Sequence, residues 1–349
     1  MKTIIFSILS LLISFSVFAQ TYYVKVKPYG KRQWTYIDLQ EAPIEIGLHQ
    51  NCYPFTKDGI SVVKDNNQFA FLKADGEMLE TEIKQFQLIH SAGIFGGIQG
   101  FHDGLVAIMV NNKWGYLDTI GILVIPLKYD FVSIFDGGYA LAKAYGRTYV
   151  INAFGEETPV EESDVYVIKR FSEGMAIYCN SEKEYGFINT KGKVAIPPKF
   201  KSVGYFMNGL AWARNFHNKI GYIDTSGAWV ITPRFSSARN FDKISGLARV
   251  KTISGWAYVN RMGDILKVNT TRYWGDFHEG LARGRKGDFF GFYDNTGTWV
   301  IQAKFQKVRN FHNGYAAAKE NDKWGLIDNV GEWVILPNYS DMRDVVKID

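Results

Sequence analysis

The sequence predicts an all-β repeat protein, and three observations support this fold class. One phrase recurs nine times, most clearly as KWGYLD at Lys113–Asp118 and KWGLID at Lys323–Asp328. Its central residue, the anchor, recurs at spacings of 34 to 37 residues, with one spacing of 45. Short alternating apolar runs separated by turn residues fill each period, which is typical of half-buried strands. Such a period indicates one continuous repeat array. The anchors of units 1 to 9 are Thr35, Ala70, Gly115, Tyr149, Gly186, Gly221, Ala257, Gly291 and Gly325.

Each unit opens with a Phe-x-x-Gly phrase, which we interpret as the start of the first strand. Its glycine admits a positive φ or a close backbone contact, and the alternating run after it, such as Leu210–Arg214, has the period of a half-buried strand. The phrase begins at Phe101, Phe135, Phe171, Phe206, Phe277 and Phe311, with a longer version from Phe241 to Ala248.

The recurring phrase itself is predicted to be the second strand, which the chain reaches through a polar hairpin such as Asn111-Asn112. The residue before the anchor is large and apolar in most units, so we expect it to be the buried ring of its unit, as at Trp324. We expect the anchor to be glycine because a neighbouring ring or backbone presses against it. Tyr149 therefore marks an atypical unit.

A tight hairpin is predicted after the second strand. Asp or Asn lies three residues past the anchor and glycine three residues later, as in Asp294 and Gly297, which suits an Asx turn with a positive φ. The third strand then carries a β-branched pair such as Val300-Ile301 and often ends at proline, as at Pro233, because proline lacks the donor that a sheet needs.

These phrases resemble the WG-repeat family of bacterial proteins, which is named for the Trp-Gly pair. The resemblance covers residues from about 30 to 349 and is weakest in the first two units, where Thr35 and Ala70 replace the glycine. It implies a repetitive all-β fold and a binding or scaffolding role. It transfers no catalytic residues.

About nine three-stranded antiparallel units of about 35 residues can form an open superhelical, solenoid-like stack or a closed β-propeller. We favour the open stack, because propeller blades usually take about 40 residues for four strands and rings usually have about four to eight blades. Degenerate first units also suit a capping role. The closed propeller stays the alternative, since a fourth strand could lie in the linker.

The chain is predicted to consist of a signal peptide followed by the repeat array. Residues 1–19 are predicted to be a signal peptide, because a short apolar run ends in Val17-Phe18-Ala19, and residues 20–349 form the array. An insertion near 91–100 is either a packed loop or a functional flap. The protein is therefore expected to be exported to the periplasm or the extracellular space, with no membrane insertion after signal removal.

The net charge bears on the choice of partner, and the positions of the cysteines bear on disulfide formation. The formal net charge is +5, which is too small to indicate a nucleic-acid partner. The basic stretch Arg283–Lys286 is interpreted as a solvated hairpin turn. Cys52 and Cys179 lie in different units, and we expect two unpaired, buried thiols.

No catalytic, metal or cofactor site is predicted. His102, His278 and His312 occupy one repeat position, which explains their recurrence without a metal. The repeated Asp and Asn residues supply one oxygen ligand per unit, too few for calcium, so turn capping is favoured. No Ser-His-Asp or Cys-His arrangement indicates an enzyme.

The predicted function is exported, non-enzymatic binding or scaffolding, in which a repeat surface is presented to a protein partner. The alternative is a glycan-binding module that uses exposed aromatic side chains. The candidate rings for this alternative are Trp212, Trp229, Trp299 and Trp333.

Overall fold

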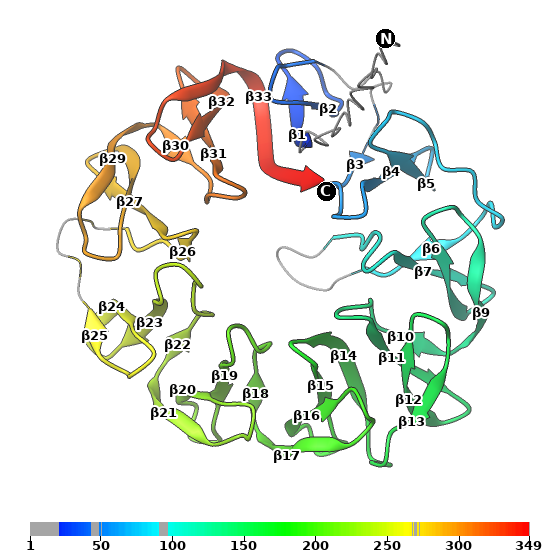
Figure 1. The fold of residues 1–349 in the computed structure, drawn as a ribbon. Coiled ribbons are helices and arrows are strands. Elements are labelled where there is room, and N and C mark those ends of the chain that lie inside the picture. Colours follow the sequence, from blue (N-terminus) through cyan, green and yellow to red (C-terminus); the bar gives the residue numbers. More distant parts are fainter. Residues whose placement is uncertain are drawn as a thin grey trace, which may run out of the picture.

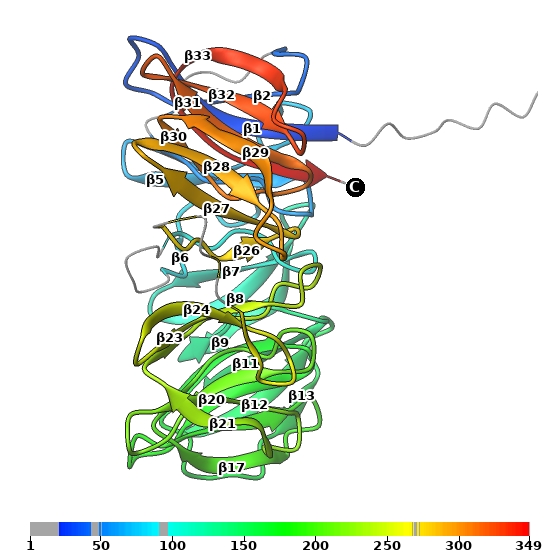
Figure 2. The same ribbon diagram turned by 90° about the vertical axis from the view of Figure 1, so that its left-hand side faces the viewer.

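The computed structural model describes residues 21–42, 49, 51–90, 97–266, 268, 271 and 273–348. Every regular element in these ranges is a β-strand, and the strands form a closed ring (Figure 1). Viewed from its edge, the ring is a flattened disc (Figure 2). The all-β prediction is confirmed, whereas the open stack is wrong and the closed β-propeller is correct. The predicted signal peptide and residues 91–96 of the insertion lie outside the described residues.

The described strands form eight hydrogen-bonded antiparallel sheets, six of which have four strands. The four-stranded sheets are β6 (Gln87–Leu88), β7 (Leu105–Val110), β8 (Lys113–Asp118), β9 (Leu123–Tyr129); β10 (Phe131–Val132), β11 (Tyr139–Ala144), β12 (Arg147–Asn152), β13 (Glu157–Pro159); β14 (Val167–Ser172), β15 (Met175–Cys179), β16 (Tyr185–Asn189), β17 (Val194–Phe200); β18 (Ser202–Val203), β19 (Ala211–Arg214), β20 (Ile220–Ile223), β21 (Trp229–Phe235); β22 (Ser237–Ala238), β23 (Ala248–Thr252), β24 (Gly255–Val259), β25 (Ile265–Leu266); β26 (Phe277–His278), β27 (Leu281–Lys286), β28 (Phe289–Tyr293), β29 (Trp299–Phe305). The three-stranded sheet is β3 (Asn51–Cys52), β4 (Ile60–Asp65), β5 (Gln68–Lys73). The six-stranded sheet is β30 (Lys307–Val308), β31 (Tyr315–Glu320), β32 (Lys323–Asp328), β33 (Trp333–Ile348), β1 (Thr21–Pro28), β2 (Thr35–Ile37).

The prediction of three strands per unit is wrong, because most units have a fourth. In unit 6 the additional strand is β18, two residues long, in the segment interpreted as a linker. It pairs with β19 and is the strand nearest the centre of the ring (Figure 1). A strand of two residues is too short to show an alternating pattern, so periodicity does not reveal it.

The ring is closed by strand β33, which serves two units. Its first part is the outer strand of unit 9, where Leu326 of β32 pairs with Ile335. Its last part turns inward and pairs with the N-terminal strand β1, where Tyr22 lies opposite Lys347. Two units therefore share the six-stranded sheet, and the nine repeat units occupy eight sheets. Closure removes the exposed ends that an open stack would have to cap.

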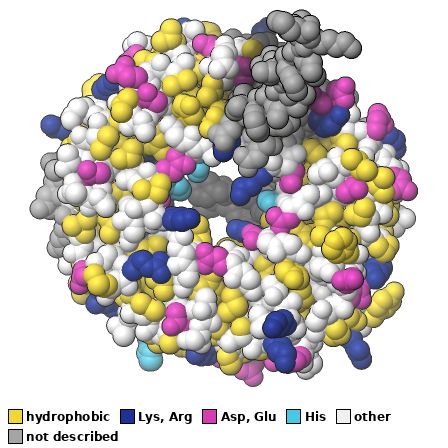
Figure 3. All heavy atoms as spheres, viewed as in Figure 1, with side chains coloured by type: hydrophobic (Ala, Val, Ile, Leu, Met, Phe, Trp, Pro, Cys, Tyr) yellow, Lys and Arg dark blue, Asp and Glu magenta, His cyan; other side chains and the backbone are white. Residues whose placement is uncertain are grey.

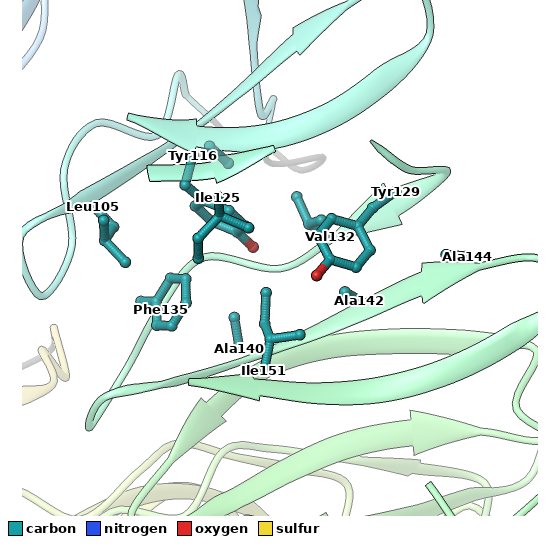
Figure 4. Packing of buried hydrophobic residues seen from close by; sticks show 11 residues of the cluster. Leu105, Tyr116, Ile125, Tyr129, Val132, Phe135, Ala140, Ala142, Ala144 and Ile151 are labelled. Atoms are coloured by element: carbon teal, nitrogen blue, oxygen red, sulfur yellow. The ribbon is translucent and has the colours of Figure 1, made fainter. Parts of the chain in front are cut away.

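The core lies between neighbouring units and repeats one ring contact. The side chain after the anchor packs against the phenylalanine of the next Phe-x-x-Gly phrase, as Tyr116 packs edge-on against Phe135 with 4.9 Å between ring centroids (Figure 4). The same contact recurs as Tyr36–Phe55, Phe71–Phe101, Phe187–Phe206, Tyr222–Phe241, Tyr258–Phe277 and Phe292–Phe311. Seven of the nine units are therefore joined to their successors by a buried aromatic pair, whereas the units anchored by Tyr149 and Gly325 carry Val150 and Leu326 at this position.

The ring before the anchor is not the centre of the core, so that prediction is wrong. Trp114 and Trp324 are half-buried, whereas Tyr116 and Leu326, two residues further on, are fully buried. Residues two apart lie on the same face of a strand. Each tryptophan lies near the start of its strand, beside the polar hairpin, where solvent reaches part of the ring.

The anchor is glycine because the outer strand presses its backbone against it, as predicted. A Cβ atom on Gly115 would lie 2.5 Å from the carbonyl oxygen of Ile125 in β9, and Gly325 has the same relation to Ile335. In both units the register between the two strands shifts at the glycine, which indicates a β-bulge. The units anchored by Ala257 and Tyr149 pair without such a shift and tolerate a side chain.

The predicted Asx turns and the state of the cysteines are confirmed. Asp294 Oδ1 accepts hydrogen bonds from the amides of Thr296 and Thr298 at 2.9 and 3.0 Å, and Gly297 has a φ of 86°. Cys52 and Cys179 are free and buried.

We expect Asp294→Asn to change the melting temperature little, because an amide oxygen can accept the same two hydrogen bonds. Gly297→Val should be clearly destabilising, because a β-branched residue resists a positive φ and its Cβ would lie 3.2 Å from Val268. Thermal unfolding of the wild type and both variants, with calcium and with chelator, checks this. If chelator lowers the wild-type melting temperature and Asp294→Asn abolishes that response, the turn binds metal and the interpretation fails.

Candidate functional site: the central cavity

A cavity of about 1110 Å³ lies at the centre of the ring. Figure 3 shows the hollow with acidic, basic and histidine side chains around it. Its wall is built from the Phe-x-x-Gly turns of units 3, 4 and 9, the equivalent turn of unit 2, and the strands β1 and β33. The polar lining residues are Lys25, Thr56, Lys57, Asp58, His102, Asp103, Asp136, His312, Asn313, Arg343, Asp344 and Lys347.

Backbone geometry explains why these turns line the cavity wall. The last two residues of the turns in units 3, 4 and 9 have a positive φ, for example 51° at Asp103 and 77° at Gly104. Two successive positive φ values are the geometry of a type I′ hairpin turn, which joins the strand nearest the centre to the next strand in the fewest residues. The third residue of the phrase is thereby exposed, as at Asp103 and Asn313.

Carboxylates on these turns connect neighbouring units, and we call these contacts latches. The carboxylate of Glu279 in unit 8 accepts hydrogen bonds from the amides of Asn313 and Gly314 in unit 9, at 2.6 and 2.8 Å. Asp103 in unit 3 accepts one from Gly138 in unit 4, at 2.9 Å. The other latches are Asp58 to Gly104, Glu173 to Asn208 and Gly209, and Asp242 to Glu279 and Gly280. Each latch satisfies turn amides with a charged acceptor.

A cluster of cations surrounds Trp34 where the two ends of the chain meet. The Lys25 ammonium lies 4.4 Å and the Arg343 guanidinium 5.1 Å from the ring centroid. Lys25 Nζ donates to the carbonyl of Cys52, and Arg343 donates to Asp341 at 3.1 Å. The pKa of Lys25 is lowered to about 8, chiefly by burial; Cys52 opposes this shift, Arg343 adds to it and Asp341 opposes it slightly. This is an ammonium held in a largely desolvated place.

The three recurring histidines do not meet at one point. His102 and His312 line the cavity, whereas His278 lies outside its lining, with its ring 5.3 Å from that of His312. Burial lowers the pKa of His102 and of His278, so both are neutral at pH 7. In the ranges given above, no group of three or more His, Cys, Asp or Glu side chains is placed to hold a metal ion.

The tryptophans proposed for glycan binding are half-buried and packed. Trp229 meets Phe200 edge-on at 5.5 Å between centroids, and Trp333 meets Phe305 in the same way at 5.4 Å. Trp299 packs against Tyr293, and Trp212 packs against the core between units 6 and 7. These rings fill space within and between units, and none of the nine tryptophans is fully exposed.

The position of Lys25 predicts a pH dependence of stability. Its pKa is about 8 in the folded protein against an ordinary value of 10.5, so between these pH values the unfolded chain binds more protons and the free energy of unfolding rises with pH. We expect the melting temperature of the wild type relative to Lys25→Met to increase from pH 7 to pH 9.5. Parallel melting curves measured across this range would contradict the assignment.

Sequence reasoning missed this cation cluster and the latches. Lys25 and Arg343 lie at opposite ends of the chain, in segments without a repeat phrase. The latch residues had a visible signal, because the third residue of Phe-x-x-Gly is acidic in several units, at Asp103, Glu173 and Glu279.

Comparisons with known proteins agree with the fold. A family model described as "WG containing repeat" matches residues 92–114, 114–147, 185–218, 220–252, 290–324 and 324–347, just over half of the chain. A crystal structure of the eukaryotic initiation factor aligns with a TM-score of 0.61 and 9% identity, over 94% of this chain and 98% of that chain. This likeness shows the fold alone.

Two bacterial structures align less well. BamB from Moraxella catarrhalis has a TM-score of 0.42 and 11% identity, over 80% of this chain and 91% of its own. Apo AztD from Citrobacter koseri has a TM-score of 0.41 and 8% identity, over 94% of this chain and 99% of its own. A comparison with curated protein sequences gives no match. Within the described ranges, no helix is long and apolar enough to cross a membrane.

Proposed function

Because this chain belongs to the WG containing repeat family, we propose that it is a non-enzymatic binding protein that presents the cavity-bearing face of its ring to a protein partner. The observation that carries the proposal is the construction of the cavity wall. Turns from four units and the two terminal strands place side chains of both charges around one cavity of about 1110 Å³. Such a wall offers many polar contacts over a wide area, which suits a protein surface.

The rest of the ring supports the choice of this face. Prolines such as Pro126 and Pro233 interrupt the outermost strands. Proline lacks the amide donor through which another strand could be added, so the outer edge resists pairing with a further strand. The cavity wall carries exposed turn residues such as Lys57 and Asn313.

We further propose that the protein acts outside the cytoplasm, in the periplasm or the extracellular space. The proposal rests on the apolar run Ile4–Phe18 and the small residue Ala19 before Gln20. N-terminal sequencing of protein expressed from the full chain in a bacterial host tests it. Mature protein that begins at Gln20 supports export, and retention of Met1 on the folded protein contradicts it.

A capture experiment with residues 20–349 tests the binding function. Envelope extract is passed over the wild type, over Lys57→Glu at the cavity, and over Lys191→Glu in an Asx turn at the outer rim. Both lysines are exposed, so both variants should fold. We expect an enriched protein that Lys57→Glu loses and Lys191→Glu retains. No reproducible enrichment, or equal loss with both variants, contradicts the proposal. Quenching of tryptophan fluorescence by a polysaccharide, with no protein captured, would favour the glycan alternative.

A further inference from the structure

Strands β1 and β33 create an irregularity at the cavity where the chain closes on itself. Val24 pairs with Val345 and Val26 with Met342, so Lys25 alone lies opposite Arg343 and Asp344. This two-against-one arrangement is a β-bulge, a feature that redirects side chains and is frequent next to functional sites. Lys25, Arg343 and Asp344 all line the cavity. The closing seam of the ring therefore places two cations and one carboxylate at the wall.

The carboxylates of the cavity wall already have hydrogen-bond or ion-pair partners within the protein. Asp58 and Asp103 accept latch hydrogen bonds from turn amides, at 2.9 Å each. Asp136 forms an ion pair with Arg170 of unit 5, and Asp344 lies 3.5 Å from His312. Asp341, behind the wall, is shared between Arg309 and Arg343, at 3.0 and 3.1 Å.

The cations at the seam are less completely neutralised. Lys25 donates to a neutral carbonyl, and among the described residues no carboxylate lies within ion-pair distance of its ammonium. Within the described part of the chain, Arg343 pairs with one carboxylate, that of Asp341, which also pairs with Arg309. Lys57 on the same wall is exposed. A buried ammonium without a counter-charge is costly, and an anionic ligand would remove that cost.

Trp34 holds the two cations in position for such a ligand. Its ring lies 4.4 Å from the Lys25 ammonium and 5.1 Å from the Arg343 guanidinium. Cation–π contacts compensate part of the lost hydration and leave the hydrogen-bond donors available. The positions of the donors are thus fixed before any ligand arrives, which lowers the entropic cost of binding.

We propose that the seam binds a carboxylate of an acidic segment of the protein partner, through Lys25 and Arg343, an inference that rests on the proposed binding function. The size of the cavity favours a peptide over a small free anion, because a phosphate ion would fill only a small part of about 1110 Å³. An extended peptide can place a carboxylate at the seam while its backbone follows the turns, where Thr56 and Asn313 offer hydrogen-bonding groups.

Fluorescence anisotropy with a labelled peptide of alternating Glu and Ser tests the proposal on residues 20–349. A peptide with Gln in place of Glu is the ligand control, and Lys191→Gln at the outer rim is the protein control. We expect at least a tenfold loss of affinity with Lys25→Met, with Arg343→Gln and with the Gln peptide, no change with Lys191→Gln, and weaker binding in higher salt. Arg343 is exposed, so its variant carries the test if Lys25→Met does not fold.

Other outcomes overturn the proposal in distinguishable ways. Equal binding of the Gln peptide, or equal loss with Lys191→Gln, shows that the seam does not recognise carboxylates. Displacement of the peptide by equimolar inorganic phosphate shows a free-anion site. If the capture experiment enriches a partner that Lys25→Met and Arg343→Gln retain, the binding function stands and the seam assignment fails. If the acidic peptide binds as expected but no partner is captured, the seam assignment stands and the protein-binding function fails.

Discussion

Gly115→Val is expected to destabilise the protein by about 3 kcal/mol or more, the upper range for overpacking. The added Cβ would lie 2.5 Å from the carbonyl oxygen of Ile125, 2.9 Å from the carbonyl carbon of Pro126 and 3.0 Å from the amide nitrogen of Leu127. All three atoms belong to the backbone of strand β9, which cannot move aside as a flexible side chain would. The bulge in β9 must therefore be lost, together with the contacts that it makes with the next unit.

Urea unfolding of the variant measures this loss, and Ala257→Gly is the control at the equivalent position of unit 7. That unit pairs without a register shift, so its anchor has room for a side chain. Ala257→Gly should cost about 1 kcal/mol or less, the usual effect of glycine in a strand. A Gly115→Val protein as stable as the wild type would show that the outer strand can retreat at little cost.

Val345→Asp is expected to prevent cooperative folding or to lower the melting temperature by more than any surface substitution. Val345 is 2% exposed, pairs with Val24 of β1 and lies in the core that joins the two ends of the chain. A carboxylate buried there without a partner costs several kcal/mol, or shifts its pKa until it is protonated. The substitution therefore tests whether closure of the ring contributes to the stability of the whole molecule.

Val334→Asp is the matched control, because Val334 lies in the same strand β33 but in its outer part, where it is 36% exposed. It should change the melting temperature little. Equal effects of the two substitutions, or a Val345→Asp protein that melts like the wild type, would contradict a ring held shut by β1 and β33.

Local features of the fold were predictable because each is set by a few neighbouring residues. The turn at Asp294 and Gly297 follows from an Asx side chain and a glycine three residues later, and the anchor at Gly115 follows from its small size between apolar residues. The position of the buried ring was missed, because Trp114 and Tyr116 lie on one face of a strand and only the strand's surroundings decide which is deeper. The two-residue strand β18 was missed because it is too short to carry a period.

Closure of the ring was not predictable in the same way. A small rotation between successive units decides between an open stack and a ring, and the repeated phrases are compatible with both. The decisive contact joins β1 to the end of β33, two segments that carry no repeat phrase. The cation cluster of Lys25 and Arg343 depends on that contact, so it could not be found before the ring was known.

The latches give the ring a direction. Each carboxylate reaches forward along the chain, so Glu279 supports the turn of unit 9 while its own amide is held by Asp242 of unit 7. Loss of the Glu279 carboxylate should therefore speed amide hydrogen exchange at Gly314 and leave Gly280 protected. The series is interrupted where Gly137 offers no side chain and where Asn208 and Asn313 replace a carboxylate. The latches therefore form three separate runs, from unit 2 to unit 4, from unit 5 to unit 6 and from unit 7 to unit 9, and a change at one turn should affect hydrogen exchange mainly within its own run.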